Sequence, residues 1–182
     1  KQHLVKKNID WNKKHKELID LSDTYRNKQN FDCIVPFSGG KDSTFTLWYV
    51  VKKLKLKPLV VQFDHGFFRP TFITNNRNTF KKLGVNVLSY TPNWQLVKKL
   101  MRISLERKGD FCWHCHAGIF AYPIRVAVDL KIPLVIWGEP SSEYTAYYNY
   151  GDEEEELVDR NRFDRFINLG RSEEHTSELQ SQ

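Results

Sequence analysis

The sequence contains few cysteines and no long apolar run. Its three cysteines, Cys33, Cys112 and Cys115, are too few for a framework of disulfide bonds. We therefore expect a reducing, cytoplasmic setting. No apolar stretch approaches the ~20 residues that a membrane-spanning helix needs, so we expect no membrane partner. The chain opens at Lys1 with polar residues, and we expect no signal peptide.

Two common nucleotide-binding motifs are also absent. The sequence contains no G-x-x-x-x-G-K-[ST] loop of the Walker A type and no G-x-G-x-x-G dinucleotide fingerprint. Hydrophobic residues make up 40% of the chain and charged residues 27%, as in an ordinary globular domain. The formal net charge of +6 suits phosphate-bearing ligands or RNA and does not choose between them.

The patterning divides the chain into three parts. Residues 1–30 are expected to form an N-terminal amphipathic helix that Asp10 can cap, and residues 31–170 a single nucleotide-binding domain. Residues 171–182 show no helical or strand period. Most of this string resembles the translation of sequencing-adapter DNA, so we interpret it as a non-native tail, with a natural chain that continues past about Gly170. A natural disordered tail is the alternative.

Strands and helices are expected to alternate along the domain. Helices are predicted over residues 10–28, 44–56, 72–83, 95–107 and 117–131, strands over 31–37, 58–63, 85–90 and 134–137, and a turn over 109–116. The strands are continuous apolar runs, which is typical of a parallel sheet covered on both faces. We therefore predict an α/β fold with a doubly wound parallel sheet. Ligands bind such sheets at the carboxyl ends of the strands, where Ser38–Ser43, Asp64–Gly66 and Gly138–Tyr144 would lie.

The loop SGGKDS follows the first predicted strand and precedes a helix. A strand–loop–helix connection points backbone N–H groups at an anion. Gly39 and Gly40 allow a tight turn and close approach to phosphate, and Lys41 adds a positive charge. Ser38 and Ser43 add hydroxyl donors, while Asp42 can orient the loop or help to hold Mg²⁺. A glycine turn with polar neighbours is the alternative.

Cys112 and Cys115 have the Cys-x-x-Cys spacing of half a tetrahedral zinc site. Thiolates also serve redox or sulfur-carrying chemistry. A second pair is missing, and Cys33 lies inside a predicted strand from which it cannot reach. Three interpretations stay open: a zinc half-site whose other ligands lie elsewhere, two reduced cysteines that pack a turn, and sulfur transfer.

The loop SGGKDS resembles the pyrophosphate loop, S-G-G-x-D-S, of the ATP pyrophosphatases, which have the adenine nucleotide alpha hydrolase-like (PP-loop, HUP-like) fold. The order IDWNKKHKEL, FDCIVPFSGGKDS, FCWHCHAGIF and IPLVIWGEPSSEY further resembles the N-acetyl sugar amidotransferases of bacterial surface-polysaccharide (O-antigen) and flagellin-sugar pathways. This resemblance covers about residues 9 to 150, and its specific parts are CWHCHAGIF and IWGEPSSEY.

The resemblance implies an ATP-dependent amidotransferase. Such an enzyme adenylylates the acetamido oxygen of an N-acetylated sugar, releases pyrophosphate, and lets ammonia from a separate glutaminase subunit replace the activated oxygen. ATP and Mg²⁺ are the implied cofactors, with Zn²⁺ as a further candidate, and a nucleic-acid partner is not expected. Family members also carry a cysteine-rich segment before the N-terminal helix and a further C-terminal region. This sequence shows neither segment, so we expect this chain to bind ATP with little or no turnover.

The resemblance also assigns roles to residues. Lys41 and Asp42 are the implied catalytic residues. The implied ATP-binding residues are Ser38, Gly39, Gly40, Lys41, Asp42, Ser43, Phe63, Asp64 and Gly138. Glu139 and Glu143 are candidates to bind Mg²⁺ or the sugar.

Two rival functions use the same loop. A tRNA sulfurtransferase shares the adenylylation step, and Cys112 or Cys115 would carry the sulfur. A non-catalytic module would instead bind an adenine nucleotide to regulate a partner, although the intact Lys41-Asp42-Ser43 argues against this.

Overall fold

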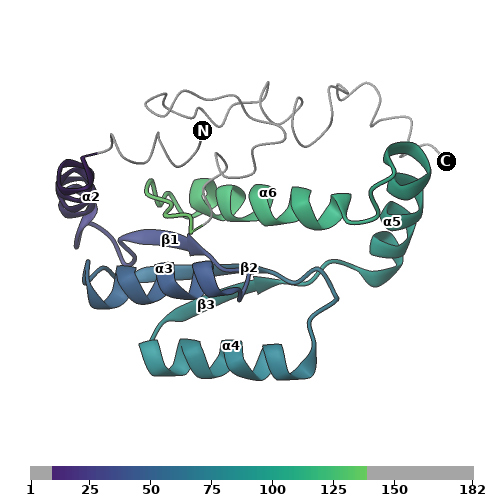
Figure 1. The fold of residues 1–182 in the computed structure, drawn as a ribbon, viewed down its shortest axis with the longest axis horizontal. Helices are drawn as coiled ribbons and strands as arrows, with labels where there is room; N and C mark the ends of the chain where they lie inside the picture. The colour runs from purple at the N-terminus through teal and green to yellow at the C-terminus, as the bar shows by residue number, and fades with distance from the viewer. Residues whose placement is uncertain (1–9, 139–182) are drawn as a thin grey trace. The chain divides into compact units, whose positions relative to one another are not determined.

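The structure, a computed structural model, describes residues 10–138, and this part is a mixed α/β arrangement (Figure 1). It contains five helices and three strands, in the order α2 (Trp11–Tyr25), β1 (Cys33–Pro36), α3 (Lys41–Lys52), β2 (Pro58–Phe63), α4 (Pro70–Leu83), β3 (Asn86–Tyr90), α5 (Trp94–Lys108) and α6 (Trp113–Asp129). The expectations for Glu139, Glu143 and the tail lie outside the described residues. None of the described helices has the length and apolar character needed to cross a membrane.

The three strands form one parallel sheet in the order β1-β2-β3. Val35 of β1 is paired with Val60 of β2, and Val60 is in turn paired with Val87 of β3. Each parallel neighbour is reached through a helix, α3 and then α4, as parallel strands require. The predicted parallel sheet is confirmed for these strands.

The predicted fourth strand, residues 134–137, is reduced to a single parallel bridge between Val135 and Ile34. The Ile34 N–H donates to the Leu134 oxygen at 2.8 Å, and the Ile136 N–H donates to the Ile34 oxygen at 2.9 Å. The segment is short because Pro133, which has no N–H to donate, precedes it and a bend at Gly138 follows. The segment nevertheless lies along the edge of β1 that faces away from β2. The chain therefore adds β2 and β3 on one side of β1 and this segment on the other side, so the order of the strands reverses at β1.

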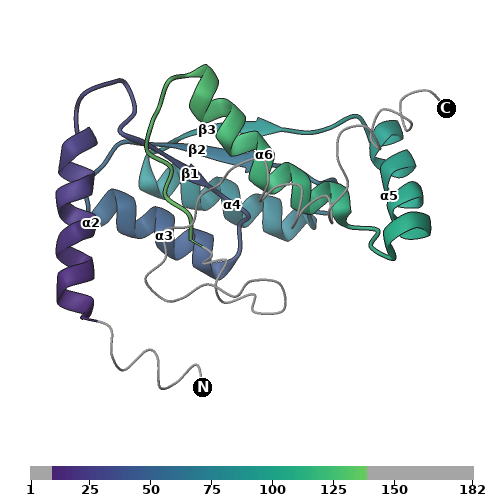
Figure 2. The same cartoon turned by 90° about the horizontal axis from the view of Figure 1, so that it is seen from above.

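Helices cover both faces of the sheet (Figures 1 and 2). Side chains of β1 alternate between two cores: Val35 packs with Leu47 and Val50 of α3, whereas Ile34 packs with Val126 of α6. The cover is uneven, because every residue of β3 is exposed. The prediction of a sheet covered on both faces therefore holds for β1 and β2 and is wrong for the edge strand.

Two predicted helix boundaries are wrong. The helix α3 begins at Lys41 instead of residue 44, so the second half of SGGKDS is helical. The helix α6 begins at Trp113, so part of the predicted turn over 109–116 is also helical. Other boundary signals are confirmed. The Asp10 side chain caps α2, and Gly84, at φ 66°, ends α4.

Asp32 fastens the end of α2 to the strands. Its side chain is 2% exposed and accepts hydrogen bonds from the Asn27 N–H at 2.6 Å and the Lys57 N–H at 2.8 Å. Arg26 donates to the Leu54 oxygen at 2.8 Å across the same junction. The carboxylate thus joins the chain that enters β1 to the chain that enters β2.

Replacing Asp32 by Ala is expected to lower the free energy of unfolding by about 2–4 kcal/mol, because two backbone N–H groups lose a charged acceptor in a buried place. Urea denaturation followed by circular dichroism measures this change. Asp20→Ala, at an exposed position of α2, is the matched control and should change stability by less than about 0.5 kcal/mol. Equal effects of the two substitutions would contradict the role assigned to Asp32.

Candidate functional site

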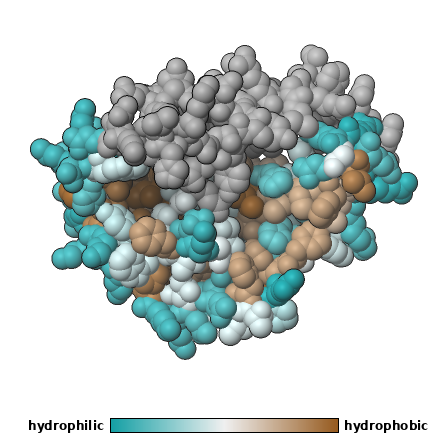
Figure 3. All heavy atoms as spheres, viewed as in Figure 1, coloured by the Kyte–Doolittle hydropathy of each residue, from teal (hydrophilic) through white to brown (hydrophobic). Residues whose placement is uncertain are grey.

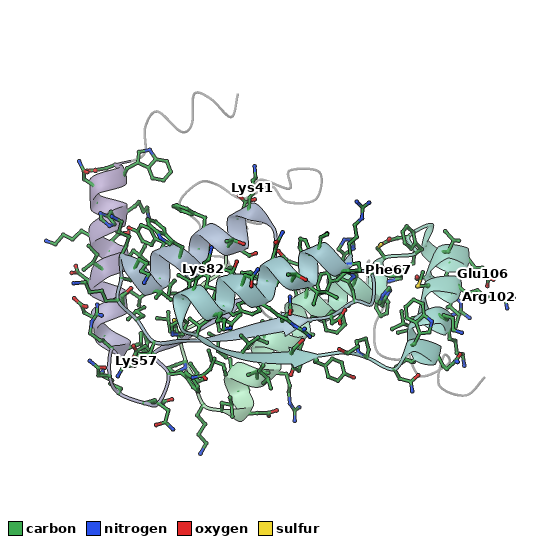
Figure 4. All side chains as sticks on the ribbon, turned by 90° about the horizontal axis from the view of Figure 1, so that it is seen from below. Lys41, Lys57, Phe67, Lys82, Arg102 and Glu106 are labelled. Carbon is green, nitrogen blue, oxygen red and sulfur yellow. The ribbon has the colours of Figure 1, made fainter. Side chains whose placement is uncertain are left out.

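The SGGKDS loop connects the carboxyl end of β1 to α3. Residues 38–40 are the loop proper, and Lys41, Asp42 and Ser43 form the first turn of α3. Lys41 projects from the start of this helix (Figure 4) and is exposed. The loop therefore lies at the sheet edge where the direction of chain progression reverses, which is the usual place for ligands in open α/β sheets.

Gly39 meets two separate requirements for glycine. Its φ of +87° lies in the left-handed region that other residues rarely adopt. A Cβ atom at this position would also lie 2.5 Å from the Phe72 ring and 2.7 Å from the Asn76 amide nitrogen of α4. The loop can therefore turn and pack on α4 only with glycine here.

The Ser43 hydroxyl holds the loop together from within. It is 3% exposed, accepts from the Ser38 hydroxyl and from the Gly39 N–H, both at 3.1 Å, and donates to the Gly40 oxygen at 3.3 Å. Its hydrogen-bonding capacity is thus used inside the loop. Ser43, predicted as an ATP-binding residue, acts in this structure as the group that shapes the loop.

The start of α3 presents donors for an anion. The first N–H groups of a helix have no intrahelical acceptor, and within the described residues no side chain hydrogen bond caps α3 at Gly40. The helix dipole and the Lys41 ammonium add positive potential there. Asp42 adds a negative charge in the same turn, which fits a place where Mg²⁺ accompanies phosphate.

An apolar hollow adjoins the loop. It holds about 370 Å³ of empty space only when the part that is open to solvent is counted, so it is a shallow depression and not an enclosed cavity. Its walls come from β1, β2, α6 and the chain after Val135, and its lining residues are Pro36, Phe37, Ser38, Ser43, Val61, Phe63, Ile119, Pro123, Trp137 and Gly138. Ser38 and Ser43 are the polar groups, so the hollow suits a flat, mostly apolar ligand group beside an anion site.

Two glycines bring the walls of the hollow together. A Cβ atom at Gly118 of α6 would lie 2.2 Å from the Phe63 ring, so this helix lies directly on the end of β2. A Cβ atom at Gly138 would lie 2.5 Å from the Thr46 hydroxyl of α3. Close approach of backbone to neighbouring side chains is a recurrent use of glycine. The structure thus brings the predicted residues Ser38, Ser43, Phe63 and Gly138 into one place.

Asp64 does not line this hollow. Its carboxylate accepts the Gly66 N–H at 2.9 Å, and its own N–H donates to the Tyr90 oxygen at 2.8 Å. These bonds make Asp64 the residue that turns the chain after β2. The neighbouring His65 accepts the Phe67 N–H at Nδ1, at 3.2 Å. Burial lowers the pKa of His65, although the Asp64 carboxylate acts in the opposite sense.

The cysteine pair lies at the start of α6. Cys112 is the N-cap residue, and its N–H donates to the Asp110 carboxylate at 2.8 Å. Burial raises the pKa of Cys112, and the negative charge of Asp110 adds to this effect. Burial also raises the pKa of Cys115, to about 11, and the nearby Cys112 and Asp110 contribute to this rise. Cys33 is fully buried in β1, as predicted. Two thiols would make up half of a tetrahedral zinc ligand set, and nowhere in residues 10–138 do three metal-binding side chains come together.

Sequence reasoning gave no role to three residues of this region: His114, Ile119 and Trp137. Ile119 and Trp137 line the hollow, and His114 is 5% exposed at the start of α6. All three lie within the stretches FCWHCHAGIF and IPLVIWGEPSSEY, but nothing in the spacing assigns them a role. The one local signal was Gly118, because a glycine inside a predicted helix costs stability relative to alanine and so calls for a packing reason.

Comparison with known proteins leaves the family open. No protein-family model matches the chain. The uncharacterized protein MJ1599 of Methanocaldococcus jannaschii is 30% identical over 108 residues, which are 59% of this chain and 38% of that protein, so the chain spans little more than a third of this curated relative. A crystal structure of a predicted subunit of tRNA methyltransferase from the same organism is 18% identical, with a TM-score of 0.39, over 75% of this chain and 63% of that one. A likeness this low identifies neither fold nor function.

Gly118→Ala is expected to lower the free energy of unfolding by about 1–3 kcal/mol, because the new methyl group overlaps the Phe63 ring. The double variant Gly118→Ala/Phe63→Ala should lose less free energy of unfolding than the two single variants lose together, because removing the ring makes room for the methyl group. A double-mutant cycle by urea denaturation measures the coupling. Strict additivity would contradict the contact.

Proposed function

We propose that this chain carries the ATP site of an ATP pyrophosphatase of the PP-loop type. The observation that carries the proposal is the joining of SGGKDS, at the start of α3, to the apolar hollow that Phe63 and Gly138 help to line. The β- and γ-phosphates would bind at the loop, near Lys41 and the N–H groups of the first turn of α3. The adenine ring would lie in the hollow against Phe63.

The resemblance of SGGKDS to the pyrophosphate loop implies cleavage between the α- and β-phosphates. The loop would grip the β- and γ-phosphates as one leaving group, and Lys41 and Mg²⁺ would neutralise the charge that develops on it. The α-phosphorus would remain exposed to a second substrate. An oxygen of that substrate would attack it, the α–β bond would break, and pyrophosphate would leave.

The finer proposal is that the second substrate is an N-acetylated sugar. Its support is the resemblance of CWHCHAGIF and IWGEPSSEY to the sugar amidotransferases. An amide oxygen is a poor leaving group. Adenylylation binds this oxygen to the α-phosphorus, so that it can leave as part of AMP. The amide nitrogen loses its proton when the oxygen attacks the α-phosphorus. Ammonia then attacks the carbon, and the bond between carbon and the AMP oxygen breaks to give an acetamidino group.

The roles of the protein in this reaction are mainly positioning and charge stabilisation. Lys41 would contact the phosphates, and Asp42 would orient the loop or help to hold Mg²⁺. Glu139 or Glu143, which lie outside the described residues, would bind Mg²⁺ or the sugar. Ammonia would come from a separate glutaminase. A sulfur-carrying role for Cys112 or Cys115 is less favoured, because a nucleophilic thiol needs a lowered pKa and both of these are raised.

Lys41→Ala is expected to weaken ATP binding by about ten- to hundredfold, since a charge-assisted contact contributes about 1.5–3 kcal/mol. Isothermal titration calorimetry of the chain with Mg-ATP measures the affinity. Lys52→Ala removes an exposed lysine from the other end of α3 and should leave the affinity unchanged. Equal affinities of the two variants would argue against a phosphate site at Ser38–Ser43.

Turnover is expected to yield AMP and pyrophosphate together with an amidated sugar. The assay combines a longer protein that contains these motifs with ATP, glutamine, a glutaminase and candidate N-acetylated sugars. Mass spectrometry should detect a slightly lighter and strongly basic sugar, because NH replaces O. Production of ADP and phosphate alone would exclude adenylylation, and sulfur incorporation into bulk tRNA in place of a new sugar would favour thiolation.

A further inference from the structure

A group of aromatic rings lies beyond the end of β2, next to the proposed ATP site. It joins His65 and Phe67 of the loop after β2 to Trp94 at the start of α5 and His114 at the start of α6. The Phe67 ring lies 5.7 Å from the Trp94 ring, 5.8 Å from the His65 ring and 6.3 Å from the His114 ring, between centroids. Three segments that are distant in sequence therefore meet at one place.

His114 is the unexplained member of this group. The residue is 5% exposed, and neither Nδ1 nor Nε2 has a hydrogen-bond partner. A buried polar group without a partner is costly and uncommon in folded proteins. Residues four apart share one face of a helix, so His114 lies on the face of α6 from which Gly118 contacts Phe63. The free ring nitrogens thus lie one helical turn from the wall of the hollow.

The rings of Phe67 and Trp94 are accessible from outside. Phe67 is 44% exposed and Trp94 is 45% exposed. Gly66, at φ +86°, lies against Trp94, since a Cβ atom there would be 3.0 Å from the ring. Apolar side chains gather on this side of the molecule between α4 and α5 (Figure 3), and Phe67 lies in the same region (Figure 4). An exposed aromatic surface thus borders a buried, unpaired histidine.

We propose that Phe67, Trp94 and His114 form the subsite for the acetamido sugar, an inference that rests on the proposed function. The apolar C–H face of a pyranose ring stacks on the exposed faces of Phe67 and Trp94. His114 is buried next to the Phe67 ring, so the acetamido group reaches its imidazole once that ring moves aside, and the ring nitrogens then pair with it by donating or accepting a hydrogen bond. An acetamido group carries the matching carbonyl oxygen and N–H, so one of the two pairs with a ring nitrogen that otherwise has no partner.

The position of the subsite agrees with the chemistry. The acetamido oxygen has to approach the α-phosphorus of an ATP whose adenine lies against Phe63. The contact of Gly118 with Phe63 places α6 against that ring, and His114 lies one helical turn away along α6. His65 adds a second donor, because its Nδ1 accepts the Phe67 N–H and its Nε2 therefore carries the proton in the neutral ring.

The test measures binding of free N-acetylglucosamine and of glucose to the 182-residue chain by saturation-transfer NMR, with ATP affinity measured separately. The chain is expected to bind N-acetylglucosamine more tightly than glucose. Phe67→Ala and Trp94→Ala should each weaken sugar binding about tenfold. Phe111→Ala and Trp11→Ala, which remove exposed rings outside this group, are the matched controls and should have no effect.

His114→Phe separates a binding role from a structural one. It keeps a buried ring of similar size and removes both nitrogens, so we expect the preference for N-acetylglucosamine over glucose to disappear while thermal stability is retained or increased. ATP affinity should stay within about twofold in every variant. Failure of the unmodified chain to prefer the acetamido sugar, or sugar binding unchanged by these substitutions, would overturn the subsite. Absence of ATP binding would instead overturn the proposed function, and the two failures are measured independently.

Discussion

The hydrogen bonds on both edges of β1 are the constraint on which the described structure depends. On one edge β1 is paired with β2, and on the other Ile34 exchanges hydrogen bonds with Leu134 and Ile136. Because the direction of chain progression reverses at β1, the helices on either side diverge at its carboxyl end. The SGGKDS loop, the apolar hollow and the chain up to Gly138 all meet in that space.

Buried polar groups in this region are of two kinds, those whose hydrogen bonds are formed within the protein and those that have no partner. Ser43 is buried and fully occupied by bonds within its own loop, so its contribution is to hold the backbone of the loop in shape. His114 is equally buried and has no partner at either nitrogen. A protein keeps such a group at a cost to stability where a ligand supplies what the fold does not. Satisfied groups thus define the geometry of the loop, and the proposed subsite would supply the partner that His114 lacks; Gln62 Nε2 of β2 is a second buried nitrogen without a partner.

Local signals in the sequence predicted most of the elements, and contacts between elements decided what was missed. Residues close in sequence explain the parallel direction of the strands, the cap of α2 at Asp10 and the end of α4 at Gly84. The start of α3 was missed because Gly40 has no side chain with which to signal a cap. The loop could be found from its composition, whereas the hollow depends on how α6 packs across β2, which no local pattern encodes. The same holds for the burial of His114.

The pairing of Ile34 with Val135 also has a consequence for biosynthesis. The chain between these residues has to leave the ribosome before the second edge of β1 can be covered, although β2 becomes available much earlier. Contacts between residues so distant in sequence also form slowly. During synthesis the nascent chain therefore holds an incomplete sheet whose inner strand has an open edge, the kind of surface on which chaperones act and misassembly begins. Within the described residues, the apolar hollow beside the SGGKDS loop is among the last parts to be completed.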